Sequence, residues 1–249
     1  MQEVVVIPTD LVLSNVDFQK LQKLDTCTVS NAIDRLKVRL RNEGSILGTA
    51  VHCQFPDFAP MLGYAATGRI RSTSAPVRGR AYHENMNWWR YVASVPEPRI
   101  MVLQDVDHTP GGGALVGELH ALIALALNCV GYVTNGSVRD LPEVEALGFH
   151  LFAGSLAVSH MYAHVSEYGE PIEIGGLKIE SGDLLHGDRH GVHSIPLSIA
   201  SEIPGMVTQM LSEERELRDF CRSPRFSLEG LDRKLEVLPG DGVETPLTG

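Results

Sequence analysis

The sequence has few cysteines and no long apolar run, and both shortages exclude classes of protein. Its four cysteines are far apart and form no CxxC pair, so we expect neither a disulfide framework nor a zinc knuckle. The longest apolar stretch, residues 121–133, contains Asn128 and is much shorter than the roughly 20 residues that cross a bilayer. The N-terminus lacks the basic and apolar regions of a signal peptide. We therefore expect a soluble, cytoplasmic protein that does not contact membranes.

Positive charge is also scarce. The chain has 21 Lys and Arg against 31 Asp and Glu, which gives a formal net charge of −10 at pH 7. A surface that follows nucleic-acid phosphates depends on clustered Lys and Arg. We therefore expect no nucleic-acid partner, although a local site for a small anion stays compatible with this balance.

The N-terminal part of the chain predicts helices followed by strands. The 249 residues, 43% of them hydrophobic, are enough to bury a large core. From Asn15 to Leu40 apolar residues recur at helical spacing, with Thr28 or Ser30 as a cap between two helices. Residues 44–77 form short runs broken by Gly and Pro, which predict strands and loops.

The middle of the chain predicts alternating strands and helices. RIMVLQD, from Arg99 to Asp105, is typical of a buried strand, GELHALIALALN of a buried helix and CVGYVT of a second strand. Asn135 and Gly136 predict a turn, and a further helix is expected to begin near Leu141. This alternation is typical of an α/β fold.

The C-terminal part predicts short strands and one helix. PIEIGGLKIE and DLLHGDRHGVHSIP are typical of strand pairs joined by Gly-rich turns, and the segment from Ile203 to Arg222 is typical of a charged helix. We expect a mobile tail over residues 239–249. One domain would then cover residues 1–238.

The strongest chemical signal is GGGALVGELH, followed by Arg139 and Asp140 after a gap of twenty residues from Glu118. A glycine run that opens a helix lets backbone N–H groups approach an anion, and the helix N-terminus adds roughly half a positive charge. The intervening helix and strand return the chain to the same sheet edge, where Arg139 is a fork-shaped donor. Glu118 and Asp140 offer the carboxylates that Mg²⁺ or Mn²⁺ prefers, and such a cation would polarise a 2-oxo group.

Each of these residues also has a purely structural interpretation. Asp140, with Glu143 three residues later, matches a helix cap at Leu141. Glu118 could simply complement the helix dipole, and the glycines could only form a tight turn. The residues alone leave both interpretations open.

The segment from Pro110 to Asp140 resembles the RraA-like superfamily, which includes 4-hydroxy-4-methyl-2-oxoglutarate and 4-carboxy-4-hydroxy-2-oxoadipate aldolases and regulators of ribonuclease E activity. LDTCTVSNAIDRL, LPEVEALGFHLFA and IEIGGLKIESGDLLHGDRHGVHSIP extend the likeness over most of the chain. The resemblance implies a phosphohistidine-domain-like α/β fold with α-β-β-α layers around a central sheet. It also implies a homotrimer or homohexamer with the site at a subunit boundary.

The resemblance assigns roles to the same residues. Asp140 would bind the divalent metal directly, Glu118 would hold a metal-bound water, and Arg139 would grip the substrate and stabilise an enolate. An acid from the neighbouring subunit's C-terminal helix would assist, and Glu213, Glu214 and Glu216 lie in that stretch. Backbone amides of one loop would hold the substrate carboxylate; its residues are Gly113, Ala114, Leu115, Val116, Gly117, Glu118 and Leu119.

The chain departs from the aldolase pattern at two places. Glu118 stands where these aldolases usually carry Asp, and its extra methylene can change the distance to the metal. Residues 80–98 differ from the usual loop, and their Trp88 and Trp89 either shape the pocket or pack.

Three other chemistries are weaker. His186, His190 and His193 suggest a metal cluster, and His160 with His164 has i, i+4 spacing, but a strand–turn–strand segment need not bring the first three together. His120, beside the loop, is either a proton-transfer group or a packed helix residue. A Schiff-base aldolase needs a desolvated lysine, and none of the chain's five lysines lies in the motifs. PGGGALVGE also lacks the GxGxxG of a dinucleotide site.

The resulting hypothesis is a divalent-metal-dependent lyase that cleaves a small 4-hydroxy-2-oxo acid to pyruvate and can decarboxylate oxaloacetate. Two alternatives stay open. One is a non-catalytic, protein-binding regulator of the ribonuclease E inhibitor type, and the other is a related lyase acting on a sugar-acid or aromatic-degradation intermediate.

Overall fold

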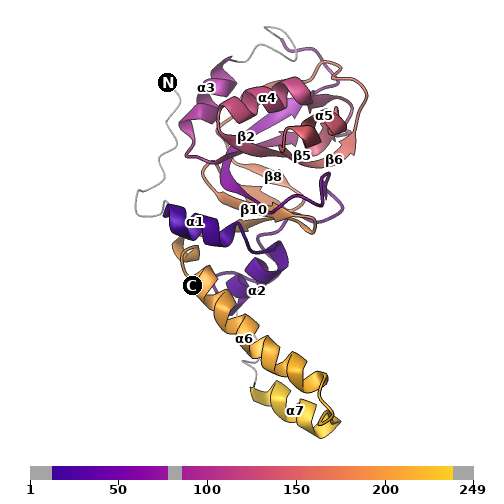
Figure 1. Ribbon diagram of the computed structural model, residues 1–249. Helices are drawn as coiled ribbons and strands as arrows, with labels where there is room; N and C mark the ends of the chain where they lie inside the picture. Colours follow the sequence, from indigo (N-terminus) through magenta and orange to yellow (C-terminus); the bar gives the residue numbers. More distant parts are fainter. Residues whose placement is uncertain (1–12, 78–85, 238–249) are drawn as a thin grey trace. The chain divides into compact units, whose positions relative to one another are not determined.

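A computed structural model describes residues 13–77 and 86–237 (Figure 1). The chain divides into two compact units, Met1–Ile203 and Pro204–Gly249, and each is described by itself below. The mobile tail expected over residues 239–249 lies outside the described residues.

Two helices open the described chain, as the apolar spacing predicts. They are α1 (Asn15–Leu21) and α2 (Thr26–Leu36). The predicted cap was wrong, because the N-cap of α2 is Asp25, whose carboxylate accepts the Thr28 N–H at 2.9 Å and the Thr28 hydroxyl at 2.7 Å. A carboxylate one residue before the helix satisfies a first-turn N–H that has no partner within the helix.

A sheet of nine strands, formed by the described residues, is the centre of the first unit. Its middle is parallel, in the order β6-β5-β3-β2, and antiparallel strands extend it on both sides. The strands are β1 (His52–Cys53), β2 (Met61–Arg71), β3 (Arg99–Asp105), β4 (Ala114–Val116), β5 (Cys129–Val138), β6 (His150–Leu156), β7 (His164–Tyr168), β10 (Leu184–Asp188) and β11 (Gly191–Ile195). A separate hairpin joins β8 (Ile172–Ile174) to β9 (Leu177–Ile179).

The turn predicted at Asn135 and Gly136 was wrong, because β5 continues through both residues to Val138. Its pairing with β6 shifts register between Thr134 and Ser137. At the irregularity the Asn135 side chain bonds to the β3 backbone, accepting the Asp105 N–H at 2.7 Å and donating to the Asp105 carbonyl at 3.0 Å. A side-chain amide therefore replaces regular ladder hydrogen bonds, and the strand carries the chain on to Arg139.

Helices α3 (Met86–Ser94), α4 (Glu118–Ala126) and α5 (Leu141–Ala146) lie on one side of the sheet, beside β2, β5 and β6 (Figure 1). A core cluster that includes Val102, Phe152, Ile172 and Ile179 joins sheet residues to the β8–β9 hairpin. The predicted mixed α/β fold is confirmed.

In the second unit the described residues, up to 237, form two helices. α6 (Ile203–Cys221) confirms the predicted charged helix, whereas α7 (Leu228–Val237) was not predicted. The rings of Phe220 and Phe226 lie 5.7 Å apart, and the Lys234 ammonium lies 5.6 Å from the Phe220 ring centre.

A short 3-10 turn, η1 (Leu197–Ile199), precedes α6. Of the helices in residues 13–77 and 86–237, none has the length and apolar character needed to cross a membrane.

Candidate functional site

The candidate site lies where the parallel strands end. β2, β3, β5 and β6 are parallel, so their carboxyl ends share one edge of the sheet. Ser72 follows β2, and Arg139 and Asp140 follow β5. Ligand sites of open α/β sheets lie at this edge, because side chains and helix N-termini converge there.

Asp140 is the N-cap residue of α5, which begins at Leu141 as predicted, but its side chain makes no capping hydrogen bond. Its backbone is left-handed, with φ of 57°, a conformation that aspartate tolerates better than most residues. The carboxylate instead reaches α4, where Oδ2 accepts the Glu118 N–H at 3.2 Å. Arg139 Nε lies 3.2 Å from both carboxylate oxygens. We call Glu118, Arg139 and Asp140 the Arg–Asp corner.

The Arg–Asp corner is partly open to solvent. The side chains of Arg139 and Asp140 are 29% and 31% exposed, and Glu118 is exposed at the first position of α4. The Arg139 guanidinium, the Asp140 carboxylate and the positive end of a helix dipole therefore meet at an accessible place, and the first residue of that helix, Glu118, carries a second carboxylate. Such a combination can bind an anion through Arg139 and a cation through the carboxylates.

The glycine loop before β4 directs its N–H groups inward. Gly111 N–H donates to Asp105 Oδ2 at 2.8 Å, Gly113 N–H to Ser72 Oγ at 3.1 Å, and Ala114 N–H to the Ser159 carbonyl at 3.0 Å. Gly111 has a φ of 92°, which favours glycine. These three N–H groups already have acceptors within the protein. An anion bound by the predicted loop would therefore have to accept from N–H groups after Ala114.

Two buried carboxylates hold this loop, and sequence reasoning missed both. Asp107 Oδ2 accepts the N–H groups of Ser72 and Thr73 at 2.7 and 2.9 Å and the Ser72 hydroxyl at 3.1 Å. Burial opposes the ionisation of Asp107, but these hydrogen bonds outweigh it and lower its pKa. For Asp105 burial prevails, and its pKa is raised. The available signal was the pair of acids in Asp105-Val106-Asp107, which begins at the last residue of the buried strand β3.

The other predicted loop residues differ in exposure. Leu115 and Val116 are buried in β4, whereas Leu119 is 49% exposed on α4. Trp88 and Trp89 are buried, and Trp89 lies 5.9 Å from the His120 ring. Trp89 therefore packs α3 against α4, and the Trp88 ring lies beside those of Tyr91 and Tyr168.

The histidines that resembled a metal cluster are placed differently. His186 and His193 face each other across β10 and β11, with Nδ1 and Nε2 3.2 Å apart, and both are buried. Burial lowers the pKa of His186 to about 4 and that of His193 to about 3, so both are neutral near pH 7. His190 instead lies 3.0 Å from Asp188.

The i, i+4 helical pairing of His160 and His164 was wrong, because His160 precedes β7 and His164 begins it. Within residues 13–77 and 86–237, no three His, Cys, Asp or Glu side chains gather into a metal-binding group.

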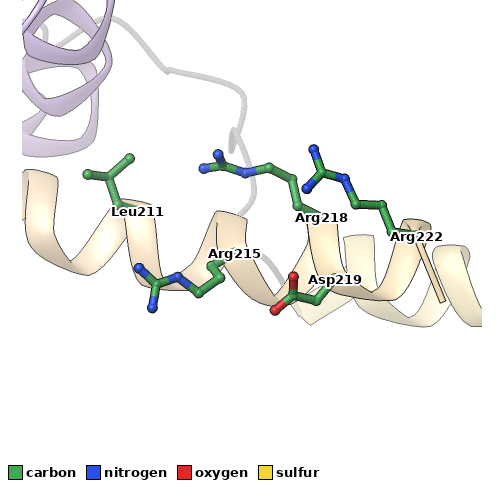
Figure 2. A pocket seen from close by; sticks show the side chains of 5 residues that line it. All are labelled: Leu211, Arg215, Arg218, Asp219 and Arg222. Atoms are coloured by element: carbon green, nitrogen blue, oxygen red, sulfur yellow. The ribbon is translucent and has the colours of Figure 1, made fainter.

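Helix α6 carries the three candidate acids of the C-terminal segment. Glu213 accepts a hydrogen bond from Gln209 at 3.0 Å, and Glu214 pairs with Arg218 at 2.8 Å. Glu216 is exposed. A hollow of about 210 Å³ on this helix is mainly basic; Leu211, Arg215, Arg218, Asp219 and Arg222 line it (Figure 2).

Two curated proteins resemble parts of this chain. Protein DlpA of Legionella pneumophila is 26% identical over 203 residues, which cover 79% of this chain and 30% of DlpA. A provisionally named 4-hydroxy-4-methyl-2-oxoglutarate aldolase of Halalkalibacterium halodurans is 33% identical over 84 residues, which cover 33% of this chain and 40% of that protein. The chain therefore spans less than half the length of either relative.

Solved structures share the fold. An uncharacterized protein from Pseudomonas syringae pv. tomato has a TM-score of 0.68 at 21% identity, over 92% of this chain and 99% of that one. Streptomyces coelicolor RraAS2, described as an unusual member of the RNase ES inhibitor RraA family, has a TM-score of 0.63 at 18% identity, over 83% of this chain and 97% of that one. The family model named RraA-like, Aldolase/RraA, matches residues 26–193, and the chain belongs to this family.

Proposed function

We propose that this protein is a divalent-metal-dependent carbon–carbon lyase that acts on a small 2-oxo acid and releases pyruvate. The observation that carries the proposal is the Arg–Asp corner, where the Asp140 carboxylate lies 3.2 Å from both Arg139 Nε and the Glu118 N–H. The family contains aldolases as well as ribonuclease E inhibitors. The accessible guanidinium beside the Asp140 carboxylate supports the proposed catalysis.

The residues at the corner fit Mg²⁺ or Mn²⁺. Mg²⁺ is commonly held by one or two carboxylates and keeps several waters, and Asp140 with Glu118 meets that requirement. Gly117 adds room, because a Cβ there would overlap the Asp140 carboxylate. When bound, the cation would polarise the 2-oxo group and stabilise negative charge. In this proposal Asp140 binds it directly and Glu118 holds a water.

In this proposal Arg139 binds the substrate and stabilises the negative charge that develops on the enolate oxygen. Its guanidinium is a planar donor suited to a carboxylate or an enolate oxygen. The N-terminal turn of α4, which includes the predicted residue Leu119, offers N–H groups that lack partners within a helix. These groups would hold the substrate carboxylate, so that binding places the 2-oxo oxygen beside Arg139.

The bond changes follow from this placement. In a 4-hydroxy-2-oxo acid the hydroxyl loses its proton, and C4 with its oxygen leaves as a second carbonyl compound. The bond between C3 and C4 breaks, and its electron pair forms the enolate of pyruvate. A proton delivered to C3 then completes pyruvate. With oxaloacetate, carbon dioxide leaves instead and the same enolate forms. The groups that stabilise the enolate therefore serve both reactions.

The proposal includes an assembled enzyme in the cytoplasm. A homotrimer or homohexamer would place an acid of a neighbouring α6 near the corner, and Glu213, Glu214 and Glu216 are the candidates. Such an acid would accept the proton of the substrate hydroxyl.

Pyruvate release tests the proposal. Purified protein is given oxaloacetate or 4-hydroxy-4-methyl-2-oxoglutarate, first with EDTA and then with Mg²⁺ or Mn²⁺. We expect release that requires both metal and Asp140, with Asp140→Ala inactive. Asp57→Ala is the matched control, because the Asp57 side chain is 96% exposed and pairs with Arg189 at the surface. Metal-independent release, or full activity of Asp140→Ala, would refute the mechanism. Absence of release from either compound would favour a narrower substrate or a regulatory protein.

A further inference from the structure

Gly117 lies between β4 and α4, directly against the Asp140 carboxylate. A Cβ at this position would overlap Asp140 Oδ2 and would lie 3.0 Å from Asp140 Cγ and 3.1 Å from Arg139 Cγ. Real Cβ atoms essentially never come closer than 3.0 Å to such neighbours. The space in which the carboxylate rests is therefore the space that any side chain at this position would fill.

The backbone of Gly117 does not itself require glycine. Its φ of −137° and ψ of −159° are extended, and ordinary residues adopt such angles. Glycine is also acceptable at the N-cap of a helix, but Ser, Thr, Asp and Asn are preferred there because their side chains accept a first-turn N–H. Neither backbone strain nor capping therefore explains why position 117 is a glycine. The short distance to the Asp140 carboxylate does explain it, because a Cβ would overlap that carboxylate.

Asp140 supplies the acceptor that Gly117 lacks. Gly117 is the N-cap of α4 and makes no side-chain cap hydrogen bond, while Asp140 Oδ2 accepts the Glu118 N–H at 3.2 Å from the end of a different strand. This contact ties the segment after β5 to the start of α4. It also sets the position of the Asp140 carboxylate relative to Glu118.

We propose that Gly117 is a positioning residue of the Arg–Asp corner, which by its lack of a side chain fixes the Asp140 carboxylate against the Glu118 N–H and beside Arg139. The inference rests on the proposed function for its catalytic consequence, but its geometric part stands apart from it. A methyl group at position 117 displaces the end of a side chain and not the backbone. The fold is therefore retained while the carboxylate moves.

Gly117→Ala is the test, and Gly48→Ala is its matched control. Gly48 is exposed, has no positive φ, and an added Cβ would meet nothing within 4 Å. Both full-length variants are compared with the parent by thermal unfolding, by amide hydrogen exchange at Glu118 and by Mn²⁺ binding in calorimetry, before any turnover is measured.

In Gly117→Ala we expect a cooperative unfolding transition close to that of the parent, faster exchange of the Glu118 amide, and Mn²⁺ affinity weakened by about 10–100-fold, as for other groups that orient metal ligands. Turnover at a fixed Mn²⁺ concentration should fall together with the Mn²⁺ affinity. Gly48→Ala should match the parent throughout. Rescue by excess Mn²⁺ would show a lowered metal affinity and not a lost fold.

The outcomes separate the inference from the proposed function. If the parent neither binds Mn²⁺ nor releases pyruvate, the proposed function fails. The exchange rate of the Glu118 amide in Gly117→Ala then remains as the test of the positioning role of Gly117. If Gly117→Ala keeps the slow exchange of that amide and the Mn²⁺ affinity of Gly48→Ala, the positioning role is refuted, whatever the activity of the parent.

Discussion

The Arg–Asp corner and the pair of His186 and His193 both gather polar side chains, but they differ in accessibility. The corner lies at the carboxyl ends of parallel strands, with Arg139 and Asp140 about one-third exposed. The two histidines lie between antiparallel strands, at 0% and 3% exposure, and are neutral near pH 7. Accessible charged groups can act on a ligand, whereas buried neutral groups mainly determine stability. Four predictions test this difference.

The largest effect is expected from Arg139→Ala. Loss of a group that stabilises transition-state charge commonly lowers kcat by about 10²–10³-fold. The free energy of unfolding should change little, because the Arg139 side chain is 29% exposed. Steady-state kinetics with Mn²⁺ measure kcat, and a urea titration of the same preparation measures the free energy of unfolding. Arg69→Ala, at another partly exposed arginine that pairs with Glu167, is the control. Parental turnover in Arg139→Ala would remove the corner from the mechanism.

The histidine pair predicts a loss of stability in acid. Both histidines have pKa values in the folded protein, about 4 and about 3, below the unfolded value of about 6.5. Below pH 6.5 the unfolded chain therefore binds more protons, so their contribution is complete above pH 6.5 and is lost as the pH falls. We therefore expect the free energy of unfolding to decrease as the pH falls from 6.5 to 4.

Urea unfolding at several pH values measures this decrease. His193→Gln, which removes one ionisable ring of the pair, should weaken the pH dependence, and His52→Gln, at an exposed histidine, should preserve it. If His193→Gln retains the full parental slope between pH 6.5 and 4, the pair is not its source.

A smaller effect on stability is expected from Ser72→Ala. Ser72 is fully buried, and its hydroxyl links Asp107 to the Gly113 N–H. Its removal takes the acceptor away from the buried Gly113 N–H, at a cost of about 1–3 kcal/mol, while Asp107 keeps the N–H groups of Ser72 and Thr73. Urea denaturation checks this, with Ser166→Ala as a control at an exposed serine that bonds to the Arg69 carbonyl. An unchanged midpoint would mean that the loop does not depend on this link.

The smallest effect is expected from Glu214→Gln. Glu214 and Arg218 form an exposed i, i+4 pair on α6, 2.8 Å apart, and such pairs contribute about 0.3–0.5 kcal/mol. Thermal unfolding at low and high salt measures the change. A loss of pyruvate release without a loss of stability would contradict a purely structural role and would select Glu214 as the acid that assists catalysis.

Much of the secondary structure was predictable from local pattern. The strand from Arg99 to Asp105 was predicted with its observed bounds, because a continuous apolar run marks a strand buried on both faces. The path through Asn135 and Gly136 was not predictable, because the Asn135 side chain bonds to the backbone of a strand thirty residues away. α7 was also missed, although Leu228, Leu231 and Leu235 lie at helical spacing.

The sequence by itself determined which groups are available: a glycine before Glu118, an Arg-Asp pair twenty residues later, and an alternation of strands and helices that brings both to one sheet edge. Only the tertiary structure decided how they are used. The sequence indicated Asp140 as a cap of the helix at Leu141, but its backbone is left-handed and its carboxylate accepts an N–H of α4 instead. His186 and His193 looked available for a metal, but burial between strands keeps them neutral and enclosed. Spacing along a chain shows which side chains can meet, whereas backbone direction and burial determine which of them do.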